Sequence, residues 1–264
     1  MAETGEKTAE KTRRTRIGTP TCDTSRLLFR GKDTLKDLVG KVTFTESVFL
    51  AVTGKLPTIQ QTRILDACLV ILMDHGITPS ALVTRLVADT VPADIQVSMA
   101  AGLLTVGNKF MGTIAGCGAL LEKGVASGQA PEQWAAAIVA DYIGARRRFP
   151  GFGHPDYFPD DPRTTRLFEV AAEAGVPGRY IHLARTLEAE IEKQGGRRLP
   201  LNATGAIGAL LCEIEFPVAA MRGVAVISRA GGLLAHALEE LETGTAWPLT
   251  QMAMKAVPYD DEGE

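Results

Sequence analysis

The residues with the clearest capacity for chemistry lie in one loop, residues 151–163, which is rich in glycine and proline. Glycines let a backbone approach a ligand closely, and prolines restrict the shape of a loop. His154 stands between Gly153 and Pro155, where it can exchange a proton near neutral pH. Arg163 follows nine residues later and can bind a carboxylate through two hydrogen bonds. The loop therefore predicts a site for a small carboxylic acid that undergoes proton transfer.

The three other histidines have different predicted roles. His75 follows Asp74 and precedes Gly76, so it either stabilises the carboxyl end of a helix or binds a ligand, and both interpretations stay open. His236 lies in an apolar helical run, which predicts a core histidine with its hydrogen bonds satisfied. His182 stands among charged neighbours and is expected on the surface.

Three more segments combine glycines with polar residues. Residues 102–113 form either a simple turn between helices or a loop whose backbone amides approach a ligand. Residues 199–208 contain the start of a helix, capped by Asn202 or Thr204. Arg229 stands among small residues at the predicted start of a helix, a setting that favours ligand binding over packing.

The elements that must position these residues are predicted to be helices. Apolar residues recur at helical spacing through most of the chain, and glycine or proline separates the segments. Alternation typical of strands is rare, with residues 15–21 and 26–29 as the best candidates. The pattern predicts an all-α fold with helices at 45–53, 60–74, 79–89, 92–104, 131–146, 164–174, 180–194, 202–212, 217–225 and 230–241.

The composition is typical of an ordinary globular protein. Of the 264 residues, 45% are hydrophobic and 22% are charged, and the net charge of -3 gives no general attraction to nucleic acid. Residues 1–16 are polar and charged, which predicts a disordered tail without the apolar core of a signal peptide. No uninterrupted apolar run reaches the ~18 residues of a membrane span. We therefore expect a cytoplasmic protein that does not cross a membrane.

The four cysteines lack the paired spacing of metal ligands, and three of them lie in apolar runs. This usage predicts buried free thiols in a reducing compartment, and no metal site is expected.

The order of the glycine-marked segments resembles that of one family. The segments are Asp74-His75-Gly76, 102–107, 151–154 with Asp161-Pro162-Arg163, Leu201-Asn202 and Ser228-Arg229. They follow one another as in the citrate synthase superfamily, and the chain is most similar to its short citryl-CoA lyase branch, which includes the C-terminal lyase module of ATP-citrate lyase. The resemblance implies a large helical domain (17–110 and 215–264), a small one (111–214), a site in the cleft between them, and a homodimer.

The resemblance also implies roles for the residues of the carboxylic acid site. His154 would bond the carbonyl oxygen of an oxo-acid such as oxaloacetate. His75, Arg163 and Arg229 would hold the acid and its carboxylates, which suits the two-pronged guanidinium group. Citrate synthases also borrow an arginine from the neighbouring subunit, but residues 246–248 contain none. The second carboxylate of a citrate-like substrate is then held differently, or the substrate lacks it.

The other implied substrate is a coenzyme A thioester such as acetyl-CoA. Arg197 and Arg198 precede Leu199-Pro200, near the place of a phosphate-binding lysine in citrate synthases. They either contact the phosphates of CoA or belong to a solvated turn, and the two interpretations stay open.

Two positions depart from the family pattern. Phe110 stands where citrate synthases have a histidine that stabilises the enol of acetyl-CoA, and the lyase module of ATP-citrate lyase is similar in having phenylalanine there. Thr204 stands where the family has an aspartate that moves the methyl proton, and a threonine hydroxyl cannot serve as an ordinary base. Asp156, two residues after His154, is either a relocated carboxylate for this step or a solvent-exposed loop residue.

The resemblance implies an enzyme with His154 and Thr204 at its catalytic positions. It would cleave or form citryl-CoA, or a related 3-hydroxy-3-carboxyacyl-CoA, with acetyl-CoA and an oxo-acid as the other reaction partners. Thr204 leaves two alternatives: an enzyme of the same fold with altered carbon–carbon cleavage or hydrolysis, and a non-catalytic protein that binds the acid or the CoA ester.

Overall fold

The structure is a computed structural model that describes residues 14–107 and 111–260, in two units that divide between Thr58 and Ile59. Phe110 and residues 1–13 of the expected tail lie outside the described residues. The domain boundaries that the resemblance implies stay a prediction.

The first unit begins with a small antiparallel hairpin of β1 (Leu28–Phe29) and β2 (Lys32–Asp33). Its turn residues Arg30 and Gly31 have φ of 50° and 79°, the left-handed conformation that such tight turns require. A π-helical turn (Thr34–Leu38) follows, and then α1 (Phe44–Thr53). The sequence prediction of α1 is confirmed, with Thr43 as its cap and Gly54 ending it in a left-handed conformation.

The second unit is helical throughout, so the predicted all-α fold is confirmed. Its α-helices are α2 (Ile59–Leu72), α3 (Pro79–Thr90), α4 (Ile95–Leu104), α5 (Gly112–Ala126), α6 (Pro131–Gly144), α7 (Pro162–Ala174), α8 (Arg179–Gly195), α9 (Ala203–Glu213), α10 (Met221–Thr243) and α11 (Ala246–Ala256). A short 3-10 turn (Val218–Ala220) precedes α10.

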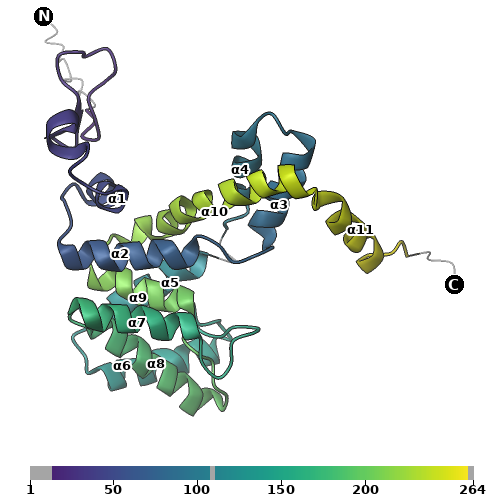
Figure 1. Ribbon diagram of the computed structural model, residues 1–264. Coiled ribbons are helices and arrows are strands. Elements are labelled where there is room, and N and C mark those ends of the chain that lie inside the picture. Colours follow the sequence, from purple (N-terminus) through teal and green to yellow (C-terminus); the bar gives the residue numbers. More distant parts are fainter. Residues whose placement is uncertain (1–13, 108–110, 261–264) are drawn as a thin grey trace, which may run out of the picture. The chain divides into compact units, whose positions relative to one another are not determined.

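The core of this unit lies around α9. Nearly all of α9 is buried, because its small apolar residues let α5, α7, α8 and α2 pack closely around it. Figure 1 shows α2, α9 and α7 running side by side, with α6 and α8 beyond them. The helix α10 contacts α2, α3, α4 and α5, so the loops that connect these helices are brought to one region.

One sequence prediction is wrong in a way that matters for the site. The helices expected at 217–225 and 230–241 are one continuous helix, α10, and Arg229 lies in its middle instead of at a helix start. Gly231 and Gly232 do not end the helix, because glycine weakens a helix by only about 1 kcal/mol and packing outweighs that cost.

The 3-10 turn and α10 together, Val218–Thr243, form the one helical stretch of the described residues that meets the length and hydropathy of a membrane span, with a mean hydropathy of 1.4 over an 18-residue window. It carries buried Arg229 and Glu240 and packs against four other helices. These are features of a core helix, and core helices commonly meet the same two criteria.

Candidate active site

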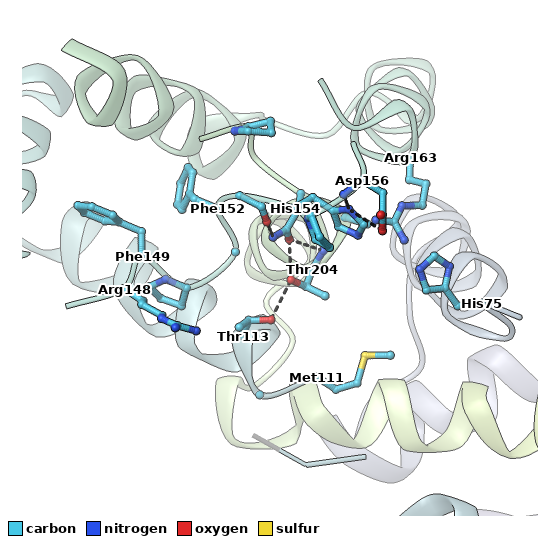
Figure 2. Close-up of a pocket in the computed structure, with 18 of the residues that line it drawn as sticks. His75, Met111, Thr113, Arg148, Phe149, Phe152, His154, Asp156, Arg163 and Thr204 are labelled. Atoms are coloured by element: carbon cyan, nitrogen blue, oxygen red, sulfur yellow. Dashed lines mark hydrogen bonds and ion pairs between the residues drawn. The ribbon is translucent and has the colours of Figure 1, made fainter. Parts of the chain in front are cut away.

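Residues that are distant in the sequence converge on one pocket of the second unit, with a volume of about 1590 Å³. Eight of the predicted site residues line it: His75, His154, Asp156, Arg163, Arg197, Arg198, Thr204 and Arg229. Figure 2 shows His75 and Arg163 on one side of the pocket, Arg148 and Phe149 on the other, and His154 and Thr204 between them. The ninth residue, Phe110, lies outside the described residues.

The loop that carries His154 is fixed against the start of α9 by a close approach of two backbones. Gly151 has φ of 86°, and a Cβ added to it would lie 2.5 Å from the Cα of Gly205. The Asn202 N–H donates to the Gly151 carbonyl at 3.0 Å, and Asn202 Nδ2 donates to the Gly153 carbonyl at 2.8 Å. Glycine is therefore required at both contact positions, because a side chain would force the loop and helix apart.

The hydrogen bonds of His154 determine which of its nitrogens carries the proton. Its Nδ1 accepts from the backbone N–H groups of Asp156 and Tyr157, at 3.1 and 3.2 Å. Since both partners donate, Nδ1 is unprotonated and the neutral ring carries its proton on Nε2. Partial burial lowers the pKa of His154, and the positive charge of Arg163 lowers it further. His154 is therefore a neutral hydrogen-bond donor near pH 7.

Arg163, at the start of α7, already has a carboxylate partner. Its Nε and Nη2 donate to the two oxygens of Asp161 at 2.9 and 2.8 Å, and Asp161 also accepts from the Ala203 N–H at 3.0 Å. Burial alone would raise the pKa of Asp161, but these hydrogen bonds hold it below its usual value. The hydrogen bond from Ala203 to Asp161 ties the start of α7 to α9, and the ion pair leaves only part of the Arg163 fork for a ligand.

Arg229 is the opposite case. The residue is 3% exposed, and its Nε has no hydrogen-bond partner among the described residues. The one side-chain hydrogen bond that it makes to the described residues is long, 3.4 Å, from Nη1 to Thr78 Oγ1. Burial lowers the pKa of Arg229, and the negative charge of Asp74, which forms no ion pair with it, offsets this effect only in part. A buried guanidinium without a carboxylate, at the wall of a pocket, indicates an anionic ligand.

Thr204 is held in a chain of polar side chains. Its Oγ1 donates to Asn202 Oδ1 at 2.6 Å and accepts from Thr113 Oγ1 at 2.9 Å. Asn202 Oδ1 also caps α9 by accepting from the Thr204 and Gly205 N–H groups, which confirms Asn202 as the cap. The hydroxyl of Thr204 can orient a ligand, but its own proton is committed to Asn202.

Asp156 and His75 complete the side of the pocket that holds His154. Asp156 Oδ2 lies 3.8 Å from His154 Nδ1, and its side chain is 80% exposed. His75 lies three residues beyond the end of α2 and lines the pocket instead of covering the last turn of that helix. The electrostatic influence of His75 lowers the pKa of His154, after the larger effects of burial and Arg163.

Further arginines line the pocket. Arg197 and Arg198 line it as expected, but Arg198 is bound to Asp160, to Glu192 and to the Pro159 carbonyl. The sequence analysis missed Arg147 and Arg148, which also line the pocket. The signal was present in the run of three arginines, Arg146 to Arg148, that directly precedes the 151–163 loop.

The thiols take no part in this chemistry. Cys68, Cys117 and Cys212 are buried as expected, whereas Cys22 is exposed. Burial raises the pKa of Cys68 and of Cys117 to about 12, so neither is a thiolate near neutral pH. The described ranges contain no cluster of three histidine, cysteine or acidic residues that could hold a metal ion.

Comparison with known proteins places the chain in a family. Residues 59–248 match the model of the citrate synthase C-terminal domain. A solved citryl-CoA lyase from Hydrogenobacter thermophilus is 32% identical, with a TM-score of 0.84 and coverage of 95% of each chain. The ATP citrate lyase of Methanothrix soehngenii, solved with citrate and coenzyme A, shares the fold at 24% identity and a TM-score of 0.78, over 97% of this chain and 42% of that one.

A curated relative, the probable ATP-citrate synthase of Dictyostelium discoideum, is 27% identical over 202 residues, or 70% of this chain. The chain spans about a third of the length of that relative. The fold and the match over most of the second unit show that the chain belongs to the citrate synthase family. The resemblance inferred from the order of the motifs is thereby confirmed.

Proposed function

We propose that the chain is a lyase of the citryl-CoA type, which cleaves or forms citryl-CoA or a related 3-hydroxy-3-carboxyacyl-CoA. The observation that carries the proposal is Arg229, a buried guanidinium without a carboxylate partner at the wall of a pocket that also contains the neutral donor His154. A carboxylate of the substrate supplies the missing partner. The pocket, at about 1590 Å³, has room for a CoA ester beside the acid.

In the cleavage direction, the bond between the tertiary carbinol carbon and the thioester-bearing carbon breaks. Its electron pair passes to the thioester as an enolate, the hydroxyl loses its proton, and the oxo-acid carbonyl forms. The Nε2–H of His154 donates to this oxygen while it gains carbonyl character, and in the reverse direction it polarises the carbonyl. His154 suits this task because its Nδ1 is already occupied by two backbone donors.

The hydroxyl proton needs an acceptor, and the enolate carbon needs a proton to become acetyl-CoA. Asp156 is the one carboxylate among the described residues that line the pocket, and Thr204 offers none. We propose that Asp156 takes the hydroxyl proton and returns it to the enolate carbon, so that the proton balance closes on one group. The variant Asp156→Asn keeps the size of the side chain but removes the base. It should lower the rate if Asp156 is the proton acceptor, and leave the rate unchanged if Asp156 is only a solvent-exposed loop residue.

The test supplies citryl-CoA and detects oxaloacetate with malate dehydrogenase and NADH. The wild type is expected to turn over, and His154→Ala to lose about 10²–10⁴-fold in rate. Asp156→Asn is expected to lose activity in the same range, whereas an unchanged rate would exclude Asp156 as the acceptor. No turnover above a heat-killed control would contradict the proposal, and binding of oxaloacetate and CoA without product would favour the non-catalytic alternative.

A second variant separates the remaining alternative. Thr204→Asp restores a carboxylate at the start of α9, where the Thr113 hydroxyl can donate to it, whereas Asn202 Oδ1 on its other side only accepts. If citryl-CoA is cleaved only by this variant, the natural chain performs different chemistry on a related acid. If the wild type is active and Thr204→Asp changes the rate only modestly, the proposed reaction stands.

We also propose that the chain acts as a homodimer or a larger homo-oligomer. The helices α10 and α11 expose several large apolar side chains, namely Leu234, Leu238, Leu241, Trp247, Met252 and Met254, with exposures between 40% and 66%. Apolar surface of this extent is typical of an interface. Light scattering during size-exclusion chromatography is expected to give at least twice the chain mass of 28.1 kDa, and a monomer mass would contradict this.

A further inference from the structure

A stripe on α10 holds the loop that carries His75. Arg229, Gly232 and His236 are spaced at i, i+3 and i+7, so they share one face of the helix. A Cβ on Gly232 would lie 2.0 Å from the carbonyl oxygen of Met73, so glycine is what lets the backbone of this loop lie directly on α10. On either side of this contact, His236 and Arg229 each reach a side chain of the same loop.

The partners of His236 determine its tautomer. Arg85 Nε donates to His236 Nδ1 at 3.1 Å, and a guanidinium has no acceptor. Nδ1 is therefore unprotonated, and Nε2 carries the proton that it donates to Asp74 Oδ1 at 2.8 Å. The Arg85 side chain is 3% exposed and is fixed in turn by Glu240, Glu239 and Thr245.

The second oxygen of Asp74 completes the connection to the pocket. Asp74 Oδ2 accepts from the Gly76 N–H at 3.0 Å, and Gly76 takes a φ of 67°. The carboxylate thus closes the turn Asp74-His75-Gly76 on itself with one oxygen and ties it to α10 with the other. His75 lies at the middle of this turn and lines the pocket.

We propose that His236 is a positioning residue of the site. Arg85 fixes the orientation of the His236 ring, and the ring in turn hydrogen-bonds to Asp74. This contact holds the turn that carries His75 at the side of the pocket that receives the carboxylic acid. The inference rests on the proposed function for the identity of that acid. It gives a role in the site to a histidine that sequence patterning assigns to the core.

The geometry predicts an order among variants. His236→Gln places an amide N–H near the position of Nε2 and keeps the donor to Asp74. His236→Asn is shorter and places its amide near Nδ1, and His236→Leu keeps only the bulk, so both lose this donor. Asp74→Asn loses one of its two contacts, because only one of its side-chain atoms can still accept.

The experiment measures the binding of oxaloacetate and of CoA separately, by calorimetry. Loss of the donor in His236→Leu, His236→Asn or Asp74→Asn is expected to weaken oxaloacetate binding about tenfold, the worth of one charge-assisted hydrogen bond, and to leave CoA binding unchanged. His236→Gln is expected to bind oxaloacetate like the wild type. The double variant His236→Leu/Asp74→Asn is expected to be no weaker than either single variant, since both act through one contact.

His182→Leu is the matched control, because His182 is an exposed histidine on α8 away from the pocket lining. Equal losses of oxaloacetate and CoA affinity in His236→Leu would overturn the inference, as would failure of His236→Gln to restore binding. If the wild type binds both ligands and His236→Leu binds oxaloacetate as tightly as the wild type does, the positioning role is contradicted but the proposed function is not. If the wild type binds neither ligand, the proposed function falls and the inference with it.

Discussion

Two walls of the pocket each carry an arginine, and the two arginines differ in their partners. On the wall formed by the starts of α7 and α9, Arg163 is paired through two hydrogen bonds with Asp161, whose side chain is fully buried. On the wall formed by α10, Arg229 is more deeply buried, at 3% exposure, but forms no ion pair with a carboxylate among the described residues. The charge of Arg163 on the first wall is compensated within the protein, whereas the charge of Arg229 on the second wall is compensated by an anionic ligand.

The difference separates residues that stabilise the fold from those that bind. A buried pair resists loss of either member, because the charge that is left behind is no longer compensated. An unpaired buried cation costs stability in the free protein, and an anionic ligand removes that cost when it binds. The two walls should therefore respond to mutation with opposite combinations of stability and affinity.

The largest expected effect is on the stability of the paired wall. Asp161→Ala leaves Arg163 without its carboxylate and the Ala203 N–H without an acceptor, so the free energy of unfolding should fall by about 3–5 kcal/mol. Urea denaturation measures this loss. Glu169→Ala, which removes one of the two exposed carboxylate partners of Arg166, is the control and should cost no more than about 1 kcal/mol. An equal loss of unfolding free energy in Asp161→Ala and Glu169→Ala would show that the Asp161 pair stabilises the protein no more than an exposed ion pair does.

The next effect is on affinity at the unpaired wall. Arg229→Leu removes a buried charge that has no partner, so the unfolding free energy should be unchanged or higher. Oxaloacetate binding should weaken by about 100-fold, as expected for two charge-assisted hydrogen bonds to a carboxylate. Calorimetry and urea denaturation on the same preparations test both parts. A destabilised variant with intact affinity would reverse the assignment of the two walls.

The exposed arginines Arg148 and Arg197 of the pocket lining offer a weaker, salt-dependent contrast. The double variant Arg148→Ala/Arg197→Ala removes two exposed charges and should weaken CoA binding about tenfold at low salt, and less at high salt. Oxaloacetate binding should not change. Calorimetry at two salt concentrations measures the affinity for CoA in the wild type and in the double variant. An equal affinity in both proteins would show that these two arginines do not contact CoA.

The smallest effect concerns the pH dependence of His154, which stands next to the paired wall. Burial and Arg163 hold its pKa in the folded protein below the ordinary value of 6.5. The unfolded chain therefore takes up this proton first, so the stability contribution is complete above about pH 6.5 and declines as the pH falls below it. The acid limb of kcat/KM should likewise lie below pH 6.5, and a limb above that value would show that the ring is not held neutral.

Much of this arrangement can be read from local sequence patterns. The helical spacing of apolar residues predicts the all-α fold, and Thr43 with Gly54 marks both ends of α1 because capping depends on neighbouring residues alone. The glycines around His154 identify the loop for a similar reason. The patterns fail at α10, where a glycine pair that weakens a helix locally is overruled by packing against four other helices.

The sequence by itself determined which groups are present: a histidine in a glycine-bound loop, arginines for carboxylates, and a threonine where the family has an aspartate. Only the tertiary structure decided the state of those groups. Asp161 pairs with Arg163 while Arg229 stays unpaired, His154 and His236 each carry their proton on Nε2, and Asp74 connects α10 to His75. Charge compensation and tautomers depend on donors and acceptors that the fold brings together from distant positions, so local residue spacing cannot specify them.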